Sequence, residues 1–384
     1  MRTIKYIIVI VLVSVFCNDT QAQKIRKYSN EFLSIGVGGG NLGMANARVA
    51  GTGDLYASYY NPAGLSHITD NFQVGYMHSE YFAGIAKYDY AGVAIPLEKG
   101  KRTLAFSFIR FGVDDIPNTL HLFEADGSIN YDNVEEFSVG EYGLFLSYGQ
   151  KLSGKVEGLS IGGSVKVIHK KVGPFATAWG FGLDAGLQYR KKGWRFGFMA
   201  RDISTTYNAW SFSFTDDEQA VLVQTNNEIP DNSVEITAPR LLVGLGYEFN
   251  IKNKFFIEPE MNIDMNVDGR RNVLIRTDPM SFDLNLGLEL NYARIVYLRA
   301  GLGNFTWQQN TLPQDDGKDE KLLMSPNIGV GLNIKGFHID YSYTNLGESE
   351  AFYSNVISLH FGLNKNKGNK SQSEDVILEA PLQQ

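Results

Sequence analysis

The sequence of 384 residues contains a single cysteine and only 11 prolines, and no stretch reaches the roughly 18 consecutive apolar residues of a transmembrane helix. Its formal net charge of −7, without a basic patch that carries interleaved aromatic residues, argues against a nucleic-acid-binding protein. The six histidines lack metal-ligand spacing, and no residues combine into a nucleophile, a base and an oxyanion hole. We therefore predict no catalytic residue, no cofactor, no metal site and no enzymatic activity.

The N-terminal residues have the organisation of an export signal. Arg2 and Lys5 precede an apolar core of 11 residues, residues 6–16, and a small residue follows at Ala22. This core is shorter than the roughly 20 residues that span a bilayer as a helix. We therefore predict a cleaved signal peptide, residues 1–22, whose removal takes away the cysteine and leaves a mature chain without thiol chemistry.

Glycine and aromatic residues are abundant, with 40 Gly, 24 Phe and 20 Tyr, and this composition favours β-structure. From Asn71 onward, apolar residues alternate with polar or small residues, for example in residues 241–250 and 284–292. Such alternation is typical of strands with one apolar face. We predict about fourteen strands, which begin near Phe72, Ile85, Thr103, Gly140, Leu159, Thr177, Trp194, Arg240, Phe255, Phe282, Val296, Asn327, Phe337 and Val356.

The connections between these strands alternate in length and charge. Short turns follow the even-numbered strands, and long loops follow five of the odd-numbered ones, at residues 112–139, 203–238, 268–281, 304–325 and 345–355. Those five loops hold 21 of the 42 Asp and Glu residues but 5 Lys and Arg, whereas the six short turns hold 12 Lys and Arg but 2 Glu. Outer-membrane barrels have short periplasmic turns and long external loops.

These patterns predict an all-β fold, a transmembrane antiparallel up-and-down β-barrel of about 14 strands with a short N-terminal hatch segment. In lipid every backbone N–H and C=O group needs a partner within the protein, so an amphipathic sheet closes on itself. The polar face then lines the lumen with Asp184, Gln188, Glu248, Glu258, Glu260, Asp264, Asp283 and Glu289. The alternative is a soluble exported β-sandwich, which would be released into the periplasm without detergent.

A glycine-rich stretch precedes the first strand. Gly38, Gly40 and Gly43 fit the pattern G-x-G-x-x-G of dinucleotide-binding loops, and a helix-compatible run, residues 44–50, follows. A dinucleotide site also needs a parallel second strand reached through a crossover helix, which the antiparallel pattern excludes. We predict instead that residues 23–70 form a compact hatch inside or below the barrel, where glycine lets the backbone pass closely through the lumen.

The hatch resembles that of a known family. Residues 32–66 read FLSIGVGGGNLGMANARVAGTGDLYASYYNPAGLS, which is similar to the N-terminal hatch of FadL-type (OMPP1/FadL/TodX) outer-membrane barrels. In that family a glycine-rich stretch leads to an Asn-Pro-Ala-Gly-Leu element, which is Asn61-Pro62-Ala63-Gly64-Leu65 here. Residues 32–36, followed by Leu42-Gly43-Met44, are most similar to the PorV/PorQ-type branch, and the resemblance implies fourteen strands.

The resemblance implies two different functions at the outer membrane of a Gram-negative, Bacteroidetes-like cell. PorV/PorQ-type barrels belong to type IX protein secretion, in which they dock translocon, cargo or attachment proteins. FadL-type proteins proper transport hydrophobic small molecules, which leave through a lateral opening in the barrel wall. We expect the docking function, with hydrophobic transport as the alternative, and we expect outer-membrane lipids around the barrel and no nucleic acid as partner.

Apolar and aromatic residues stand among the acids of the long loops. Exposed aromatic clusters tend to mark contact sites, whereas the alternative is that such residues fold onto the barrel rim. The candidate partner-binding residues are Leu122, Phe123, Trp210, Phe212, Phe214, Phe305 and Trp307.

Two shorter motifs carry less weight. Residues 158–162 fit the nucleophile-elbow pattern G-x-S-x-G, but Ser160 begins a strand and not a strand-to-helix turn. Residues 264–269 fit the first half of a calcium loop, but Ile275 stands where the loop needs a bidentate glutamate. Asp264 and Asp268 share one face of a strand with Asn262 and Asn266, so a position on the lumen-facing side explains their spacing.

Three positions carry specific expectations. We predict that Arg48 of the hatch pairs with a lumen carboxylate, Glu248 or Glu289. Pro259 cannot donate to the hydrogen-bond ladder of its strand and is a candidate for a break in the wall. After the barrel, residues 71–363, a polar tail of residues 364–384 extends on the periplasmic side, where a disordered end is favoured over a docking segment.

Overall fold

The computed structural model describes residues 29–98, 101–124, 126–154, 156–309, 320–345 and 353–363. The predicted signal peptide, the polar tail and parts of the predicted loops 304–325 and 345–355 lie outside these residues. No helix within the described ranges is long and apolar enough to span a membrane.

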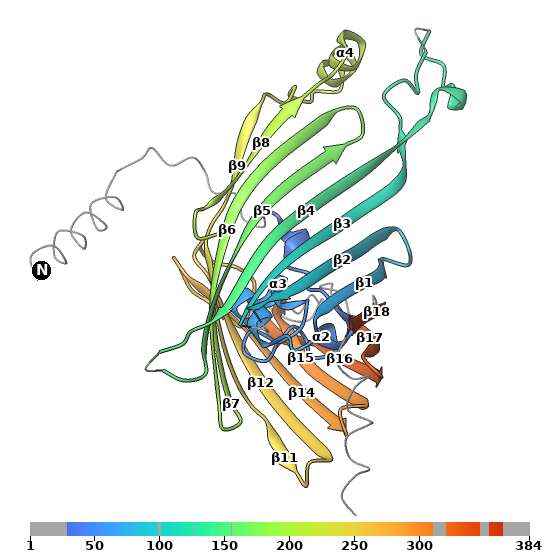
Figure 1. Cartoon of the computed structure of the whole chain (residues 1–384). Coiled ribbons are helices and arrows are strands. Elements are labelled where there is room, and N and C mark those ends of the chain that lie inside the picture. Colours follow the sequence, from blue (N-terminus) through green and yellow to red (C-terminus); the bar gives the residue numbers. More distant parts are fainter. Residues whose placement is uncertain are drawn as a thin grey trace, which may run out of the picture.

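One antiparallel sheet closes around a lumen (Figure 1). Its first strands are β1 (Phe72–Tyr81), β2 (Ala86–Leu97), β3 (Arg102–Asn118), β4 (Glu135–Lys151), β5 (Leu159–Val172), β6 (Ala176–Lys191), β7 (Trp194–Arg201), β8 (Thr206–Phe212) and β9 (Ser233–Thr237). The sheet continues with β10 (Arg240–Tyr247), β11 (Phe249–Ile251), β12 (Phe255–Asn266), β13 (Ile275–Arg276), β14 (Ser281–Tyr292), β15 (Val296–Gln309), β16 (Glu320–Ile334), β17 (Phe337–Asn345) and β18 (Tyr353–Leu363).

The sheet is closed because β1 pairs with β2 on one side and with β18 on the other. β7 and β8 pair with successive parts of β6, and they pair in turn with β10 and β9. β11 and β13 are short segments that continue β10 and β12 beside their neighbours. Fourteen antiparallel strand positions therefore surround the lumen, which confirms the predicted fold class.

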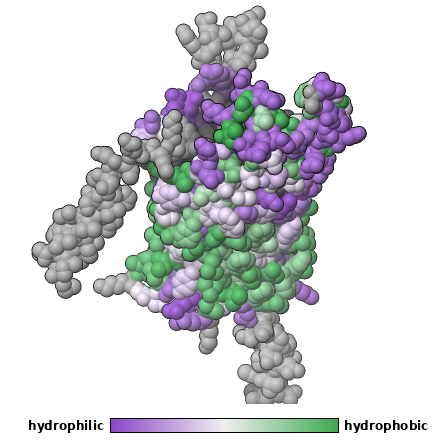
Figure 2. All heavy atoms as spheres, turned by 90° about the horizontal axis from the view of Figure 1, so that it is seen from above, coloured by the Kyte–Doolittle hydropathy of each residue, from purple (hydrophilic) through white to green (hydrophobic). Residues whose placement is uncertain are grey.

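The alternation of residue types places apolar side chains outside and polar or small ones inside. In β16, for example, Ile328, Val330 and Leu332 are exposed on the outer face, while Asn327 is buried on the inner face. Figure 2 shows hydrophobic residues gathered in a band of the outer surface, with hydrophilic residues gathered on the part of the molecule beyond it. An apolar outer band of this kind is typical of transmembrane β-barrels, in which it faces the acyl chains.

The two ends of the barrel differ. At the short-turn end, the connections β2–β3, β4–β5, β6–β7, β14–β15 and β16–β17 are tight, as predicted. At the long-loop end, several segments predicted as loops are strand, and the prediction was wrong there. β3 reaches Asn118 and β4 begins at Glu135, inside the predicted loop 112–139, and Figure 1 shows both projecting beyond the neighbouring strands. Both faces of such extensions meet water, so they lose the apolar alternation while cross-strand hydrogen bonds still pair them.

The predicted loop 203–238 also contains regular structure. It holds β8, β9 and the helix α4 (Asp216–Gln224), which begins with a capping box. The Thr215 side chain accepts a hydrogen bond from the Glu218 N–H, and the Glu218 carboxylate accepts one from the Thr215 N–H. This reciprocal pair satisfies two of the otherwise free donors at the helix start.

Residues 29–68 fill the lumen and form the hatch (Figure 1). Its short helices are η1 (Glu31–Leu33), α2 (Gly39–Leu42), α3 (Ala57–Tyr60) and η2 (Pro62–His67). α2 packs against β16, β17 and β18, and η2 packs against β3 to β6. The helix-compatible run at residues 44–50 is not helical, because Ala45 and Asn46 have positive φ angles of 50° and 63°.

Candidate functional site: the lumen and its long-loop rim

Glycine lets the hatch lie directly against the barrel wall. A Cβ atom at Gly43 would be 2.9 Å from the Cα atom of Gly329 in β16, and one at Gly40 would be 2.8 Å from the guanidinium carbon of Arg299 in β15. Gly38 has a φ of +82°, a conformation that L side chains rarely adopt. The G-x-G-x-x-G spacing therefore reflects close backbone passage in this lumen.

The Asn61-Pro62 element ties the end of the hatch to two strands. The Asn61 amide donates to the carbonyl oxygens of Leu187 in β6 at 3.0 Å and Phe198 in β7 at 3.3 Å. Its oxygen accepts from the Ala63 N–H, and Pro62 occupies the first turn of η2, where a missing N–H costs nothing. A Cβ atom at Gly64 would lie 2.3 Å from the Thr52 carbonyl oxygen, so only glycine fits there.

Arg48 binds a carboxylate of the wall, but not one of the two that we predicted. Its guanidinium lies 3.3 Å from Glu258, while Glu248 pairs with Arg195 and Arg294. Glu289 is held by Arg299 at 2.8 Å. All of these carboxylates face the lumen, and Glu258 is the one of the three that lies within ion-pair distance of Arg48.

A second anchor lies beside this ion pair. Glu260 is buried, and one of its oxygens accepts hydrogen bonds from the backbone N–H groups of Ala50 at 2.7 Å and Gly51 at 3.1 Å. The inner face of β12 thus holds the middle of the hatch through two carboxylates, those of Glu258 and Glu260.

A cavity of about 330 Å³ lies on the short-turn side of the hatch, and its lining is almost wholly polar. Arg299 joins Glu289 and Asp340 there, with nitrogen–oxygen distances of 2.8 and 2.6 Å, and all three side chains are about nine-tenths buried. Asp54 of the hatch also lines this cavity, and burial raises the pKa of its carboxyl above the ordinary value.

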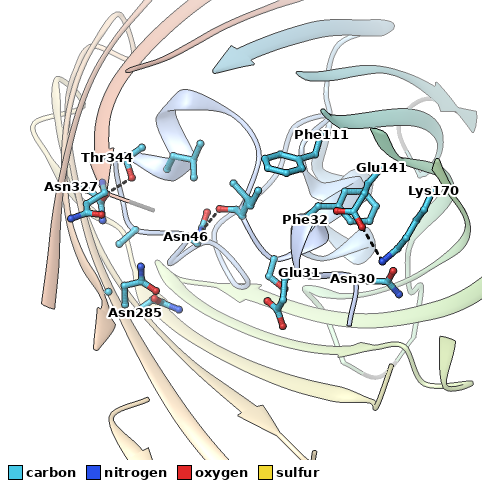
Figure 3. Close-up of a pocket in the computed structure, with 17 residues that line it drawn as sticks. Asn30, Glu31, Phe32, Asn46, Phe111, Glu141, Lys170, Asn285, Asn327 and Thr344 are labelled. Carbon is cyan, nitrogen blue, oxygen red and sulfur yellow. Dashed lines mark hydrogen bonds and ion pairs between the residues drawn. The ribbon is translucent and has the colours of Figure 1, made fainter. Parts of the chain in front are cut away.

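Two cavities of about 440 and 310 Å³ adjoin on the long-loop side of the hatch, and together they form what we call the chamber. They adjoin because both are lined by Glu31, Ser34, Asn46, Asn285 and Asn304. Figure 3 shows the larger cavity, with Phe32 of the hatch and Phe111 of β3 at one end and Asn285, Asn327 and Thr344 at the other. The volumes fall within the roughly 300–1,000 Å³ of ligand pockets.

An apolar groove lies at the long-loop rim, beside the chamber. It has a volume of about 350 Å³, and aromatic rings dominate its lining, which comprises Leu120, Val172, Phe175, Ala176, Trp210, Phe212, Phe214 and Ser233. Phe175 contacts both Phe214, with stacked rings 5.7 Å apart, and Phe137, edge-on at 5.3 Å. Phe137 lies in β4, Phe175 in the β5–β6 turn and Phe214 just after β8, so three separate parts of the chain form one apolar surface.

Lys170 stands between the groove and the chamber. Its ammonium lies 5.9 Å from the centre of the Trp210 ring, which lines the groove, and 6.0 Å from that of Phe32, which lines the chamber. Glu141 at 2.9 Å and Glu235 at 3.9 Å neutralise its charge. The Trp210 N–H donates to Glu235, which fixes the ring over the ammonium.

The predicted partner-binding residues separate into three groups. Trp210, Phe212 and Phe214 come together in the groove, whereas Leu122 and Phe123 lie at the tip of the β3–β4 extension. Phe305 and Trp307 are not loop residues as predicted, because β15 continues through them. Phe305 consequently faces inward and lines the chamber, and the Trp307 ring N–H donates to the Leu274 carbonyl oxygen.

Sequence reasoning missed Phe175, Lys170 and the chamber asparagines. Phe175 lies in a three-residue turn between β5 and β6, and no sequence signal links it to β8. Asn46 belongs to the hatch, and Asn285 is an inner-face position of β14 that period-two counting assigns to the lumen without indicating a cavity.

The acids of the calcium-like motif bind arginine. Asp264 pairs with Arg240, and Asp268 pairs with Arg271 at 2.6 Å. Within the described ranges, no group of three or more His, Cys, Asp or Glu side chains is arranged to hold a metal ion. Ser160 lies in β5 and accepts a hydrogen bond from the Ser66 hydroxyl.

The wall is uneven beside the chamber. The β14–β15 ladder ends at the pair Leu286–Leu302, and β15 bulges between Gly303 and Thr306. Beyond the end of this ladder, toward the long-loop rim, the chamber is lined by Asn285, Gly303 and Asn304. By contrast, the ladder of β12 with β14 runs without a shift past Pro259, so that proline does not open the wall.

No protein-family model matches this chain, and no curated protein matches it in sequence. Solved structures do resemble it. The Ralstonia pickettii toluene transporter TbuX has 12% identity and a TM-score of 0.51, with 86% of this chain and 99% of that chain covered. The monoaromatic hydrocarbon channel CymD has 13% identity and a TM-score of 0.52, with 86% and 98% covered.

The Pseudomonas putida toluene transporter TodX has 12% identity and a TM-score of 0.52, with 86% of this chain and 99% of that chain covered. These three neighbours are transporters and channels, and at such low identity the likeness concerns the fold. The chain therefore shares the barrel fold of these toluene transporters and this hydrocarbon channel, in agreement with the predicted fourteen-strand barrel.

Proposed function

We propose that this chain is an outer-membrane protein that captures small hydrophobic molecules from outside the cell and passes them through its wall. A signal peptide exports it, the short-turn end faces the periplasm and the long-loop end faces outward. The observation that carries the proposal is the apolar groove at the long-loop rim, which adjoins the luminal chamber at Lys170 and Trp210.

The groove supplies the capture step. An apolar molecule that leaves water for a surface of seven aromatic and aliphatic side chains gains roughly 25 cal/mol for each Å² that it buries. Val172 lines the groove and Lys170 lines the chamber, and the two side chains are neighbours on the inner face of β5. A molecule in the groove therefore lies next to the chamber. Phe32 and Phe111 continue the apolar lining on the chamber side.

The hatch directs the exit sideways. Ion pairs and backbone hydrogen bonds hold the hatch across the lumen, which obstructs a straight path to the periplasm. The chamber instead reaches the wall where β14 and β15 part. The segment that follows β12 covers this place, since Asn272 exchanges two hydrogen bonds with the backbone of Trp307. Its displacement would open a lateral exit into the membrane.

The fold of the chain supports this proposal. The toluene transporters TbuX and TodX and the channel CymD share the barrel. Their transport of hydrocarbons favours hydrophobic transport over the docking function that we expected first.

A second candidate function is that of a PorV/PorQ-type barrel, which would dock translocon, cargo or attachment proteins of type IX secretion in a Bacteroidetes-like bacterium. Exposed residues on the β3–β4 extension favour it, since Phe123 is 65% and Tyr131 76% exposed, beyond the neighbouring strands. Both functions are binding functions without catalysis.

One experiment separates the two functions. The tagged protein is purified from its own outer membrane in a gentle detergent, and mass spectrometry identifies both co-purifying proteins and extracted small molecules. A lone barrel with a bound hydrophobic compound supports uptake. Stoichiometric secretion components, or cargo proteins that share one C-terminal domain, support docking and contradict uptake as the main function.

A further inference from the structure

The chamber is lined by an unusual number of asparagines. They come from the hatch, from five strands and from the segment after β12, and include Asn46, Asn262, Asn266, Asn285, Asn304 and Asn327. An amide side chain offers a donor and an acceptor without charge. A chamber for pure hydrocarbons needs neither, so this lining indicates a ligand that carries a polar group.

Two of these amides leave an acceptor free. The side-chain oxygens of Asn262 and Asn266 are buried, and neither has a hydrogen-bond partner among the described residues. Both residues are at most 3% exposed and line the smaller cavity of the chamber. A buried acceptor without a partner costs about 1–3 kcal/mol, so a ligand that donates a hydrogen bond here gains affinity.

The charges around the chamber are mostly balanced by one another. Lys170 is neutralised by Glu141 and Glu235, Arg240 by Asp264, and Arg271 by Asp268 and Glu31.

Two charged groups have no ion pair within the described ranges. The Arg201 guanidinium lies 4.4 Å from the centre of the Tyr59 ring and donates to the Tyr59 carbonyl oxygen, so the hatch occupies it. Asp283 accepts a hydrogen bond from the Leu284 N–H. Arg201 and Asp283 are thus one cation and one anion without an ion pair in the described part of the chain, and together they favour neither a positive nor a negative ligand.

We propose that the ligand of the groove and chamber is a neutral amphipathic molecule, with an apolar tail in the groove and a hydroxyl or amide head among the chamber asparagines. This inference rests on the proposed capture of hydrophobic molecules and narrows their class. A carboxylate or an ammonium head would face Arg201 and Asp283 together, so one of these two charges would repel it. A plain hydrocarbon would leave the acceptors of Asn262 and Asn266 unsatisfied.

A matched series of ten-carbon compounds tests the inference. The full chain is reconstituted in nanodiscs at pH 7 and titrated with 1-decanol, decane, decanoate and decylamine, while the emission of Trp210 is followed. W210F identifies the signal of this tryptophan, and empty nanodiscs correct for partitioning into lipid. We expect 1-decanol to bind about tenfold more tightly than decane and than either charged compound, which corresponds to about 1.4 kcal/mol.

Two asparagine variants locate the effect. Asn266 and Asn291 both face the lumen, and each has a buried side-chain oxygen without a partner, but Asn291 lies outside the chamber. N266L is expected to reduce the preference for 1-decanol over decane, because only the acceptor of Asn262 remains, and N291L is expected to keep it. Heat-modifiable migration of each variant on a gel checks that its barrel is folded.

The outcomes are distinguishable. Decane binding as tightly as 1-decanol, or N266L leaving the preference intact, overturns the inference while capture of hydrophobic molecules stands. Tighter binding of decanoate or decylamine also overturns it. Failure of all four compounds to bind contradicts the proposed function itself.

Discussion

The lumen differs on the two sides of the hatch. On the short-turn side, arginines and carboxylates form a connected network in which Arg48, Arg195 and Arg299 each bind a wall carboxylate. On the long-loop side, asparagines line much of the chamber, beside ion pairs such as Arg240–Asp264 and Arg271–Glu31. Breaking a buried ion pair is strongly destabilising, whereas a neutral amide can exchange hydrogen-bond partners at little cost. The short-turn side therefore holds the hatch, whereas the long-loop side offers the neutral hydrogen-bonding groups that the proposed ligand would use.

Removing a cation from the short-turn side should have the largest effect. R299M leaves Glu289 and Asp340, both about nine-tenths buried, without their partner, and we expect a loss of about 3–5 kcal/mol in the free energy of unfolding. Urea unfolding in lipid vesicles measures this. The control is R102M, because Arg102 and Glu98 are about half exposed and such a pair contributes only about 0–1 kcal/mol. Equal effects of the two variants would remove the basis of the comparison.

The carboxylate that holds the hatch backbone should come next. E260L leaves the N–H groups of Ala50 and Gly51 without their acceptor, and we expect a loss of about 2–4 kcal/mol together with increased ion conductance in planar bilayers. E260Q retains a carbonyl oxygen at the same position and should behave almost as the unchanged protein. A closed, stable E260L barrel would show that other contacts suffice to hold the hatch.

The ion pair of the hatch arginine should matter less. R48M removes one partner of Glu258, but Arg195 continues to bind that carboxylate, so we expect a loss of about 1–2 kcal/mol. The double variant R48M/R195M should lose more than the sum of the single variants, because Glu258 is then buried alone. Strict additivity would argue that the two arginines act independently.

On the long-loop side, a variant should change binding while stability stays nearly constant. F212A removes an aromatic ring from the groove, and we expect about tenfold weaker binding of every compound in the ten-carbon series, about 1.4 kcal/mol. F337A, at an exposed aromatic position of the short-turn end, serves as the control. Unchanged binding by F212A would move the capture site away from the groove.

The smallest expected effect is a pH-dependent one at Asp54. Burial raises the pKa of this carboxyl in the folded state, so folding favours its protonated form and stability falls as the pH rises above the unfolded pKa of about 4. D54N keeps the oxygen that accepts from the Tyr56 N–H and carries no charge. We expect D54N to be slightly more stable at pH 7 and equal to the unchanged protein near pH 3. A constant difference across this range would contradict the assigned titration.

The sequence predicted the strands best where they cross the membrane. The expected starts at Phe72, Trp194, Phe255, Val296 and Phe337 are those of β1, β7, β12, β15 and β17. At the long-loop end the predicted starts were late, since β16 begins at Glu320 and not near Asn327. The apolar alternation arises from contact with lipid on one face, and it stops where both faces meet water, although pairing continues.

The candidate site was predicted only in part. Trp210, Phe212 and Phe214 stand two residues apart, so their shared face was readable from the sequence. Phe175 and Lys170 lie beside these three residues because β5 pairs with β6 and β6 pairs with β8. The spacing of residues in the sequence does not reveal this pairing.

The sequence by itself determined the closed barrel and the filled lumen. Amphipathic strands leave their backbone groups unsatisfied in lipid unless the sheet closes, and a glycine-rich segment before the first strand can pass closely inside. Only the tertiary structure decided which side chains meet across the lumen. Glu248, Glu258 and Glu289 all face inward, yet Arg48 binds Glu258, because strand register and tilt set the height of each carboxylate against the hatch.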